Sequence, residues 1–299
     1  MARRVLVVVN PISGRGRSLR AAERFAAAFE GAGGRAEVHR TAAAGDGGRR
    51  AAGAGAEGFD AVVAVGGDGT VTEVLNGLEG AGLPVGIVPT GTANVVAREL
   101  RLPFDAREAS RIVAGGRERP LDAGEARTTA GTRRFLCCAG AGLDGEVVKA
   151  IAEGRTGALG FRGWVGPILR SIARYDFPAI RVSADGGPPV PATTVVVCNT
   201  ANWGGLFSLV PSAAPGDGVL DACLFEGTRR RSLFRYTWGA WRGTLPGHRD
   251  VRTVRGRSFR IEADRPVAVE VDGDPFGTTP LEVRVLPGAA RVLVPGEGP

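Results

Sequence analysis

The sequence predicts an α/β protein with an N-terminal doubly wound parallel α/β domain over residues 1–127 and a C-terminal, mainly antiparallel β-sandwich domain over residues 128–299. Three observations lead to this prediction. The 299 residues exceed the length of a typical single domain. The first part alternates buried strands with helices, whereas the second part consists of short alternating segments between Gly, Pro, Asn and Asp clusters. We expect the last residues of the chain to pack back on the first domain.

The strands and helices of the first domain follow from its apolar runs. Val5–Val9 and Ala61–Val65 are continuously apolar, which is typical of parallel strands buried on both faces. Asp105 and Glu108 form a capping-box pattern that marks the start of a helix. The remaining strands are expected at Ala36–His39 and Val85–Val88, and the helices at Arg20–Phe29, Val71–Leu78 and Glu108–Ala114.

The second domain is expected to consist of short strands with helices inserted between them. Its strands are predicted at Phe135–Ala139, Ile180–Ala184, Thr194–Cys198, Leu220–Phe225, Phe259–Glu262, Val267–Val271, Leu281–Val285 and Arg291–Val294. Its helices are predicted at Leu143–Ala152, Phe161–Arg174 and Ser232–Arg242. This pattern indicates a sandwich or a curled sheet.

The composition narrows the range of partners and compartments. A net charge of +7 and an isoelectric point of about 10.1 favour a polyanionic partner, such as an anionic lipid surface or a phosphorylated substrate. Lys149 is the only lysine, so any phosphate chemistry must use arginine, backbone N–H groups or metal. The cysteines form no C-x-x-C pair, which disfavours zinc and is typical of free thiols in a reducing cytoplasm. The chain shows neither a signal peptide nor an apolar run long enough to span a membrane.

A glycine-rich loop follows the strongest predicted strand and opens a helix. Residues 65–70 read VGGDGT, and glycines there let the backbone turn tightly and expose N–H groups next to a helix N-terminus, which favours a phosphate. Thr70 and Glu73 fit a capping box. Asp68 would repel phosphates unless a divalent cation lies between them. The alternative is a glycine-rich turn with a solvated aspartate.

Two further polar loops are expected at the same edge of the sheet. Residues 10–15 (NPISGR) follow the first strand, and residues 89–94 (PTGTAN) follow the fourth and precede another helix. Ligands of doubly wound sheets bind beyond the carboxyl ends of the strands, so three such loops predict a nucleotide site.

The sequence strings that contain these loops resemble parts of one known protein family. VVVNPISGRGR, AVVAVGGDGTVTEVLNGL and PVGIVPTGTANVVARELRLP resemble the nucleotide-binding half of the diacylglycerol kinase catalytic family, especially its small bacterial lipid kinases of the YegS type. ANWGGLFSLVPSAAPGDGVLDACLFEG and VAVEVDGDPF resemble the β-rich, lipid-substrate half of that family. The resemblance covers nearly the whole chain, and its fold is the one shared with NAD kinases.

The resemblance implies an ATP- and Mg²⁺-dependent kinase that phosphorylates a lipid hydroxyl, converting diacylglycerol to phosphatidic acid, at the inner face of the membrane. By position it implies that Asp68 acts through magnesium or ordered water. It implies a magnesium loop formed by the Asp217 carboxylate and the carbonyls of Ala214 and Val219. The residues implied to hold the nucleotide are Asn10, Thr41, Gly66, Gly67, Asp68, Gly69, Thr70, Val71, Thr72 and Thr92.

The chain departs from the family at the position of the general base. Asp274 stands where the family has glutamate after VDG, and its side chain is one methylene shorter. Asp272 is the rival, and in the alternative interpretation both acids only serve the turn at Gly273. We expect Asp274 to face the GGDGT loop across a crevice between the domains.

A basic, aromatic segment lies at Thr228–Arg260. It carries ten arginines and one acid, a net charge of +9, and Phe234, Trp238, Trp241 and Leu245 recur every three or four residues. Two interpretations stay open: a helix that contacts an anionic membrane surface, and, slightly preferred, a helix that packs this stripe on the sandwich.

Other interpretations are weaker. Gly140, Gly142 and Gly145 match the dinucleotide fingerprint, but no second parallel strand follows, and a structural turn is preferred. No recognisable nucleic-acid fold is present. The function classes that remain are a lipid kinase, a kinase of another acceptor (a sphingoid base, ceramide, phosphatidylglycerol or a soluble NAD-like molecule), and a weakly active regulatory homologue. A homodimer is compatible with the sequence, which does not establish the oligomeric state.

Overall fold

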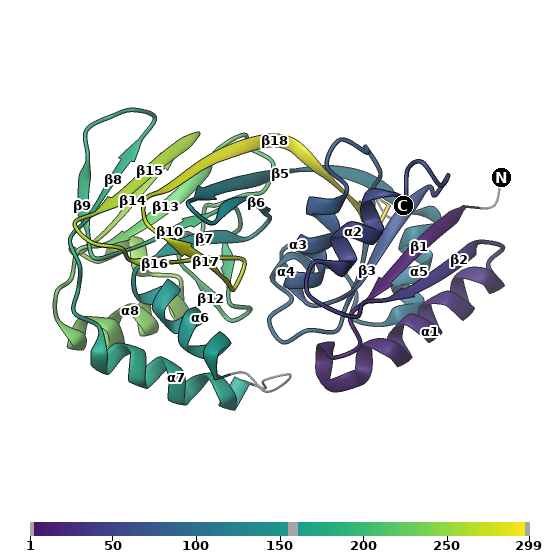
Figure 1. The fold of residues 1–299 in the computed structure, drawn as a ribbon, viewed down its shortest axis with the longest axis horizontal. Coiled ribbons are helices and arrows are strands. Elements are labelled where there is room, and N and C mark those ends of the chain that lie inside the picture. The colour runs from purple at the N-terminus through teal and green to yellow at the C-terminus, as the bar shows by residue number, and fades with distance from the viewer. Residues whose placement is uncertain (1–2, 155–160, 297–299) are drawn as a thin grey trace. The chain divides into compact units, whose positions relative to one another are not determined.

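The computed structural model describes residues 3–154 and 161–296 (Figure 1). The chain divides into two compact units. The first unit comprises residues up to Leu121 together with the C-terminal residues from Gly288, and the second unit runs from Asp122 to Pro287. Strands β5 (Arg117–Thr128) and β18 (Leu281–Val294) each begin in one unit and end in the other.

The first unit is built on a parallel sheet. Its strands lie in the order β2 (Arg35–Arg40), β1 (Arg4–Val9), β3 (Ala61–Gly66) and β4 (Val85–Pro89). The end of β18 adds to β4 in parallel, with Val292 opposite Val85. Every residue of β3 is buried, whereas the outer strand β2 is largely exposed because it has one neighbour only. The predicted doubly wound sheet is therefore confirmed.

Helices cover both faces of this sheet (Figure 1). Val5, Val7 and Val9 of β1 pack against α1 (Arg17–Gly31) and α5 (Ala106–Gly115). Alternate residues of a strand point to opposite faces, so Val8 faces α2 (Asp46–Ala52) on the other side. The remaining elements of the unit are η1 (Ser13–Gly16), α3 (Asp68–Gly77) and α4 (Val95–Glu99).

The two predicted helix starts have different outcomes. The carboxylate of Asp105 accepts N–H bonds from Arg107 and Glu108, which confirms the N-cap of α5. The capping box predicted from Thr70 is wrong, because α3 begins at Asp68 after the extended Gly67 and Thr70 lies inside the first turn. The carboxylate of Glu73 instead accepts the N–H of Gly45, at 2.9 Å.

The second unit is a sandwich of two antiparallel sheets. One sheet has the strand order β14-β13-β10-β7-β16-β17. The other contains β15, β8 and β9 next to the first half of β18, which also pairs with β5, and β5 pairs with β6. Apolar side chains of both sheets, including Val195, Ala222, Phe259 and Leu281, form one buried core. The fold class predicted for this half is therefore confirmed.

The elements of the second unit have the following bounds. The strands are β6 (Gly131–Phe135), β7 (Cys138–Ala141), β8 (Ile180–Ala184), β9 (Val190–Ala192), β10 (Thr194–Cys198), β11 (Asn202–Trp203), β12 (Phe207–Ser208), β13 (Leu220–Phe225), β14 (Val251–Gly256), β15 (Ser258–Ala263), β16 (Ala268–Val271) and β17 (Asp274–Thr278). The helices are α6 (Leu143–Glu153), α7 (Phe161–Arg174), α8 (Arg230–Arg242) and η2 (Leu245–Gly247).

Two strand predictions in this unit are corrected. The predicted strand Phe135–Ala139 is divided, since β6 ends at Phe135 and β7 begins at Cys138. The interruption places three consecutive N–H groups, those of residues 136–138, on the carboxylate of Asp272. The segments predicted at Leu281–Val285 and Arg291–Val294 are one continuous strand, β18.

Candidate active site

The three polar loops of the first unit meet at the carboxyl edge of the parallel sheet. A Cβ atom on Gly14 would lie 2.2 Å from the carbonyl oxygen of Thr90, and one on Gly91 would lie 2.5 Å from the Cα of Gly67. The backbones therefore touch where only glycine fits. The loop after β1 thus contacts the loop after β4, which in turn contacts the loop after β3.

Polar side chains hold these loops in place. The Oδ1 atom of Asp68 accepts the N–H of Val96 at 3.2 Å, which ties the GGDGT loop to the start of α4. Asn94 is buried with a φ of 48°, and its side-chain amide bonds both the N–H and the carbonyl of Gly91. Asn94 was not among the predicted nucleotide ligands, although its place in the GTAN string was a local signal.

The predicted nucleotide ligands lie in this first unit. Asn10 follows β1 and accepts the N–H of Ile12, and Thr41 follows β2 and donates its N–H to Val9. Thr92 lies on the exposed side of the loop after β4. Thr70, Val71 and Thr72 are buried, whereas residues 67–69 at the start of α3 are partly exposed, which is where a helix N-terminus offers N–H groups to a ligand.

Asp272 and Asp274 lie on either side of a tight turn in the second unit. Asp272 and Gly273 have φ angles of 50° and 82°, as in a type I′ hairpin between β16 and β17. Asp272 accepts its three N–H bonds at 2.9–3.0 Å. Asp274 is 54% exposed, and its Oδ2 lies 3.9 Å from Nη1 of Arg133. The turn therefore separates a carboxylate that organises the fold from one that faces solvent.

A buried pair of acids lies directly behind this turn. Glu270 of β16 is 1% exposed, is hydrogen-bonded to Asp144 of α6, and accepts the N–H of Gly273 at 2.7 Å. Burial and the neighbouring Asp144 raise the pKa of Glu270 well above its ordinary value, and burial raises the pKa of Asp144 to about 6. The side chain of Trp203 also bonds Asp144. Sequence reasoning missed this pair; the signal was an acid in the otherwise apolar run VAVEV.

The glycines that match a dinucleotide fingerprint are explained by this packing. A Cβ on Gly140 would lie 2.7 Å from Oδ2 of Asp144 and 3.0 Å from Oε1 of Glu270. Gly142 has a φ of 108°, and a Cβ on Gly145 would lie 2.2 Å from the carbonyl of Ala268. Close packing or backbone conformation therefore explains why glycine stands at each of these positions, without any bound ligand.

The predicted magnesium loop is held by internal bonds. The carboxylate of Asp217 pairs with Arg255 and accepts the N–H of Val219 at 3.2 Å, while the carbonyl of Ala214 accepts the N–H of Gly216 at 2.8 Å. These oxygens are donors of the kind that a hard cation requires. A cation would nevertheless compete with Arg255 for the carboxylate. Among the described residues, no group of three or more His, Cys, Asp or Glu side chains is placed to hold a metal ion.

Comparison with known proteins relates both units to one protein family. Residues 4–126 match the diacylglycerol kinase catalytic domain, and residues 138–294 match the YegS C-terminal NAD kinase beta sandwich-like domain. The two matched domains follow each other along the chain and together cover both units. The chain belongs to the diacylglycerol kinase family.

Relatives share nearly the whole chain. The sequence is 30% identical to a diacylglycerol kinase of Mycobacterium tuberculosis, over 99% of this chain and 96% of that protein. It is 27% identical to a diacylglycerol kinase of Bacillus subtilis, over 99% of this chain and 97% of that protein. A crystal structure from Bacillus anthracis matches with a TM-score of 0.80 and 25% identity, over 98% of this chain and 95% of that one. None of the helices in the described parts of the chain has the length and apolar character that crossing a bilayer requires.

Proposed function

We propose that the protein is an ATP- and Mg²⁺-dependent lipid kinase that phosphorylates diacylglycerol to phosphatidic acid. The observation that carries this proposal is the meeting of three glycine-bearing loops at the carboxyl edge of the parallel sheet. The names of the M. tuberculosis and B. subtilis relatives support the choice of acceptor. We place the enzyme in the cytoplasm, peripheral to the inner face of the membrane, because its acceptor lies there.

The first unit would bind the nucleotide. N–H groups at the start of α3 point toward the loop and, with the helix dipole, favour phosphate oxygens. Asn10, Thr41 and Thr92 would complete the site from the neighbouring strand ends. Asp68 would hold the magnesium ion of the nucleotide, directly or through water. That ion would supply positive charge to neutralise the charge that develops during transfer.

The second unit would supply the base. A bond forms from the acceptor hydroxyl oxygen to the γ-phosphorus while the bond from phosphorus to ADP breaks, and the hydroxyl proton passes to a carboxylate. Asp274 suits this role because it is half-exposed and has Arg133 nearby, whereas Asp272 already accepts three backbone bonds. Such a base typically contributes about 10²–10⁴-fold to the rate.

The experiment is transfer of radiolabelled phosphate from ATP to a lipid panel in mixed micelles. The panel contains diacylglycerol, ceramide, a sphingoid base and phosphatidylglycerol, with NAD as a soluble acceptor. Label in phosphatidic acid supports the proposal. Label in another product reassigns the acceptor, and ATP binding without any transfer identifies a regulatory homologue.

Variants assign the two acids. Asp68→Asn can still accept the N–H of Val96 but loses the charge, so turnover should fall while the fold survives. Asp274→Asn should lose most turnover with ATP affinity nearly unchanged, and Asp274→Glu should retain or raise turnover. Asp264→Asn is the matched control, because Asp264 is also an exposed acid paired with an arginine of the same unit. Wild-type turnover in Asp274→Asn would exclude Asp274 as the base.

A further inference from the structure

Helix α8 presents three large aromatic side chains to solvent. Phe234, Trp238 and Trp241 are 68%, 59% and 59% exposed, and the two indole rings lie 5.2 Å apart. Their spacing of four and three residues places them on one face of the helix. Exposed apolar patches of this kind are uncommon on monomeric proteins unless they bind something.

The opposite face of α8 makes the packing contacts. Leu233, Tyr236 and Ala240 are buried, and the ring of Tyr236 lies 4.9 Å from that of Phe225 on β13. The helix is therefore anchored without its large aromatic residues. The sequence-based preference was that the stripe of Phe234, Trp238, Trp241 and Leu245 packs on the sandwich. It is wrong for the three aromatic residues, which are exposed, and of these four residues only Leu245 is buried.

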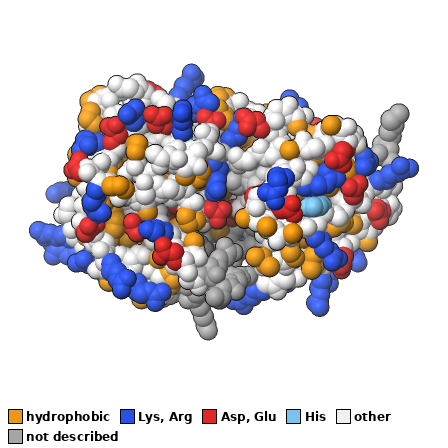
Figure 2. Space-filling view, viewed as in Figure 1, with side chains coloured by type: hydrophobic (Ala, Val, Ile, Leu, Met, Phe, Trp, Pro, Cys, Tyr) orange, Lys and Arg blue, Asp and Glu red, His pale blue; other side chains and the backbone are white. Residues whose placement is uncertain are grey.

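Five of the ten arginines of segment 228–260 lie at this helix, from Arg229 to Arg242, and one of them, Arg235, is paired with Asp250. Downstream, Arg252, Arg255 and Arg260 form ion pairs with acids. Arg229 and Arg231 are exposed at the beginning of α8, where the helix dipole disfavours positive side chains. Figure 2 shows blue side chains over the part of the second unit where Figure 1 draws α7 and α8. The charges of Arg229 and Arg231 therefore oppose the helix dipole and do not stabilise the helix.

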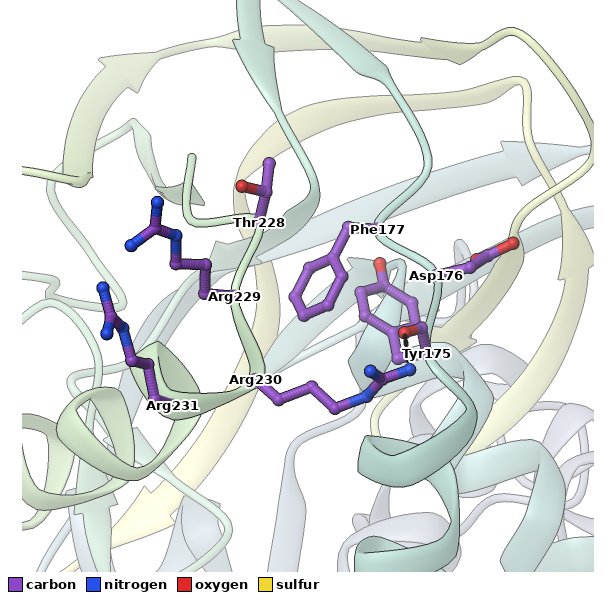
Figure 3. Close-up of a pocket in the computed structure, with 7 residues that line it drawn as sticks. All are labelled: Tyr175, Asp176, Phe177, Thr228, Arg229, Arg230 and Arg231. Atoms are coloured by element: carbon purple, nitrogen blue, oxygen red, sulfur yellow. Dashed lines mark hydrogen bonds between the residues drawn. The ribbon is translucent and has the colours of Figure 1, made fainter.

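A shallow hollow of about 690 Å³ lies beside these arginines (Figure 3). Arg230 reaches across it and donates to the carbonyls of Ile172 and Tyr175. Arg229 and Arg231 extend on the other side, away from Tyr175. Asp176, the acid in the lining, is paired with Arg265. The two arginines are therefore placed to contact an anion.

We propose that α8 docks the protein on an anionic phospholipid bilayer. The aromatic side chains of Phe234, Trp238 and Trp241 enter the interface between headgroups and acyl chains, where tryptophan is favoured. Arg229 and Arg231 bind the phosphates of anionic headgroups. Positive arginines beside exposed aromatic side chains match the negative headgroups and apolar acyl chains of an anionic bilayer. The inference rests on the proposed lipid-kinase function and specifies the surface through which that enzyme would meet its substrate.

The test is co-sedimentation of the full chain with phosphatidylcholine vesicles that contain or lack phosphatidylglycerol, without nucleotide or acceptor. Arg229→Gln with Arg231→Gln should lower partitioning onto anionic vesicles roughly 30-fold, since each arginine near such a surface contributes about 1 kcal/mol. Trp238→Ala with Trp241→Ala should lower it about tenfold or more, because two indoles leave the interface. High salt should weaken the arginine contribution.

Matched controls separate this surface from general charge and hydrophobicity. Arg20→Gln with Arg24→Gln removes two exposed arginines from α1, and Phe104→Ala removes an aromatic side chain that is 51% exposed. Both controls should partition like the wild type. Wild-type tryptophan emission should shift to the blue on anionic vesicles, and Trp238→Phe with Trp241→Phe should remove most of this shift.

Three outcomes would overturn the proposal. The first is equal binding of the wild type to neutral and anionic vesicles, and the second is a loss of binding in the α1 control equal to that in the α8 variants. The third is a dimer in sedimentation velocity that Trp238→Ala with Trp241→Ala dissociates, which would make a second copy the occupant. Turnover on a water-soluble, short-chain diacylglycerol tests the kinase separately. The α8 variants should retain that turnover, so failure of docking and failure of the proposed function can be told apart.

Discussion

The buried acid pair should make the stability of this protein fall as pH rises, and Glu270→Gln should remove this dependence. Glu270 is enclosed by Asp144, by Asp272 and by the thiol of Cys138, whose Sγ lies 3.6 Å from Oε1. Glutamine has the same shape, can still accept the N–H of Gly273 and can donate to Asp144. The substitution therefore removes a titrating proton and retains the packing.

The sign follows from the direction of the pKa shifts. Both acids have pKa values raised on folding, so the native state holds more protons than the unfolded state above about pH 4. Burial and the charge of Asp144 raise the pKa of Glu270 well above its ordinary value, so Glu270 is the member of the pair that holds its proton more tightly. One extra proton makes the free energy of unfolding fall by about 1.4 kcal/mol per pH unit.

The assay is urea unfolding at pH 6.5, 7.0, 7.5 and 8.0. The window ends at pH 8. Above it the buried cysteines also contribute to the pH dependence, because their pKa values are raised in the folded protein, whereas free thiols of the unfolded chain titrate at about pH 8.5. Glu270→Gln should be nearly flat relative to the wild type, and Glu282→Gln, which changes an exposed acid, should follow the wild type. If Glu270→Gln and wild type lose stability in parallel, the pair does not hold a proton in this range.

Two further predictions concern packing and the predicted cation loop. Gly77→Ala should destabilise the protein by about 1–3 kcal/mol in urea unfolding, because its Cβ would lie 2.1 Å from the carbonyl oxygen of Gly48, whereas Gly31→Ala meets nothing and should not destabilise. If the Asp217 loop binds Mg²⁺, then Arg255→Gln should increase the rise in melting temperature caused by Mg²⁺, because the competing guanidinium is gone. Asp217→Asn should abolish the rise; an identical rise in all three proteins would place the cation elsewhere.

Local patterns were sufficient for the frame of the first unit. Val5–Val9 and Ala61–Val65 form strands, as a short continuous apolar run predicts where a parallel sheet is buried on both faces. The glycine loops after β1, β3 and β4 were recognisable for a similar reason, since parallel strands deliver their carboxyl ends to one edge. Strand β14 was missed, because it lies at the edge of its sheet and its arginine-rich sequence lacks a buried apolar run.

Tertiary contacts decided the roles of the acids. Asp272 and Asp274 are two residues apart and chemically equal in the sequence. Only the structure, in which residues 136–138 lie beside the turn, shows that the carboxylate of Asp272 accepts backbone N–H bonds. Asp144 and Glu270 are distant in sequence, so no local pattern could pair them. The departure from glutamate at Asp274, in contrast, was visible from the sequence alone.

Helix α8 shows both what the sequence determined by itself and what only the tertiary structure decided. Its periodicity by itself determined that Phe234, Trp238 and Trp241 share a face and that arginines surround them. It could not determine which face packs inward, because period 3.6 relates residues to one another and not to the rest of the protein. The fit of Leu233, Tyr236 and Ala240 against the second unit decided that, and it left the aromatic face in water. The sequence thus determined which side chains form this face of α8. The tertiary structure decided that the face is exposed, because burial of a helix face depends on which other elements pack against it.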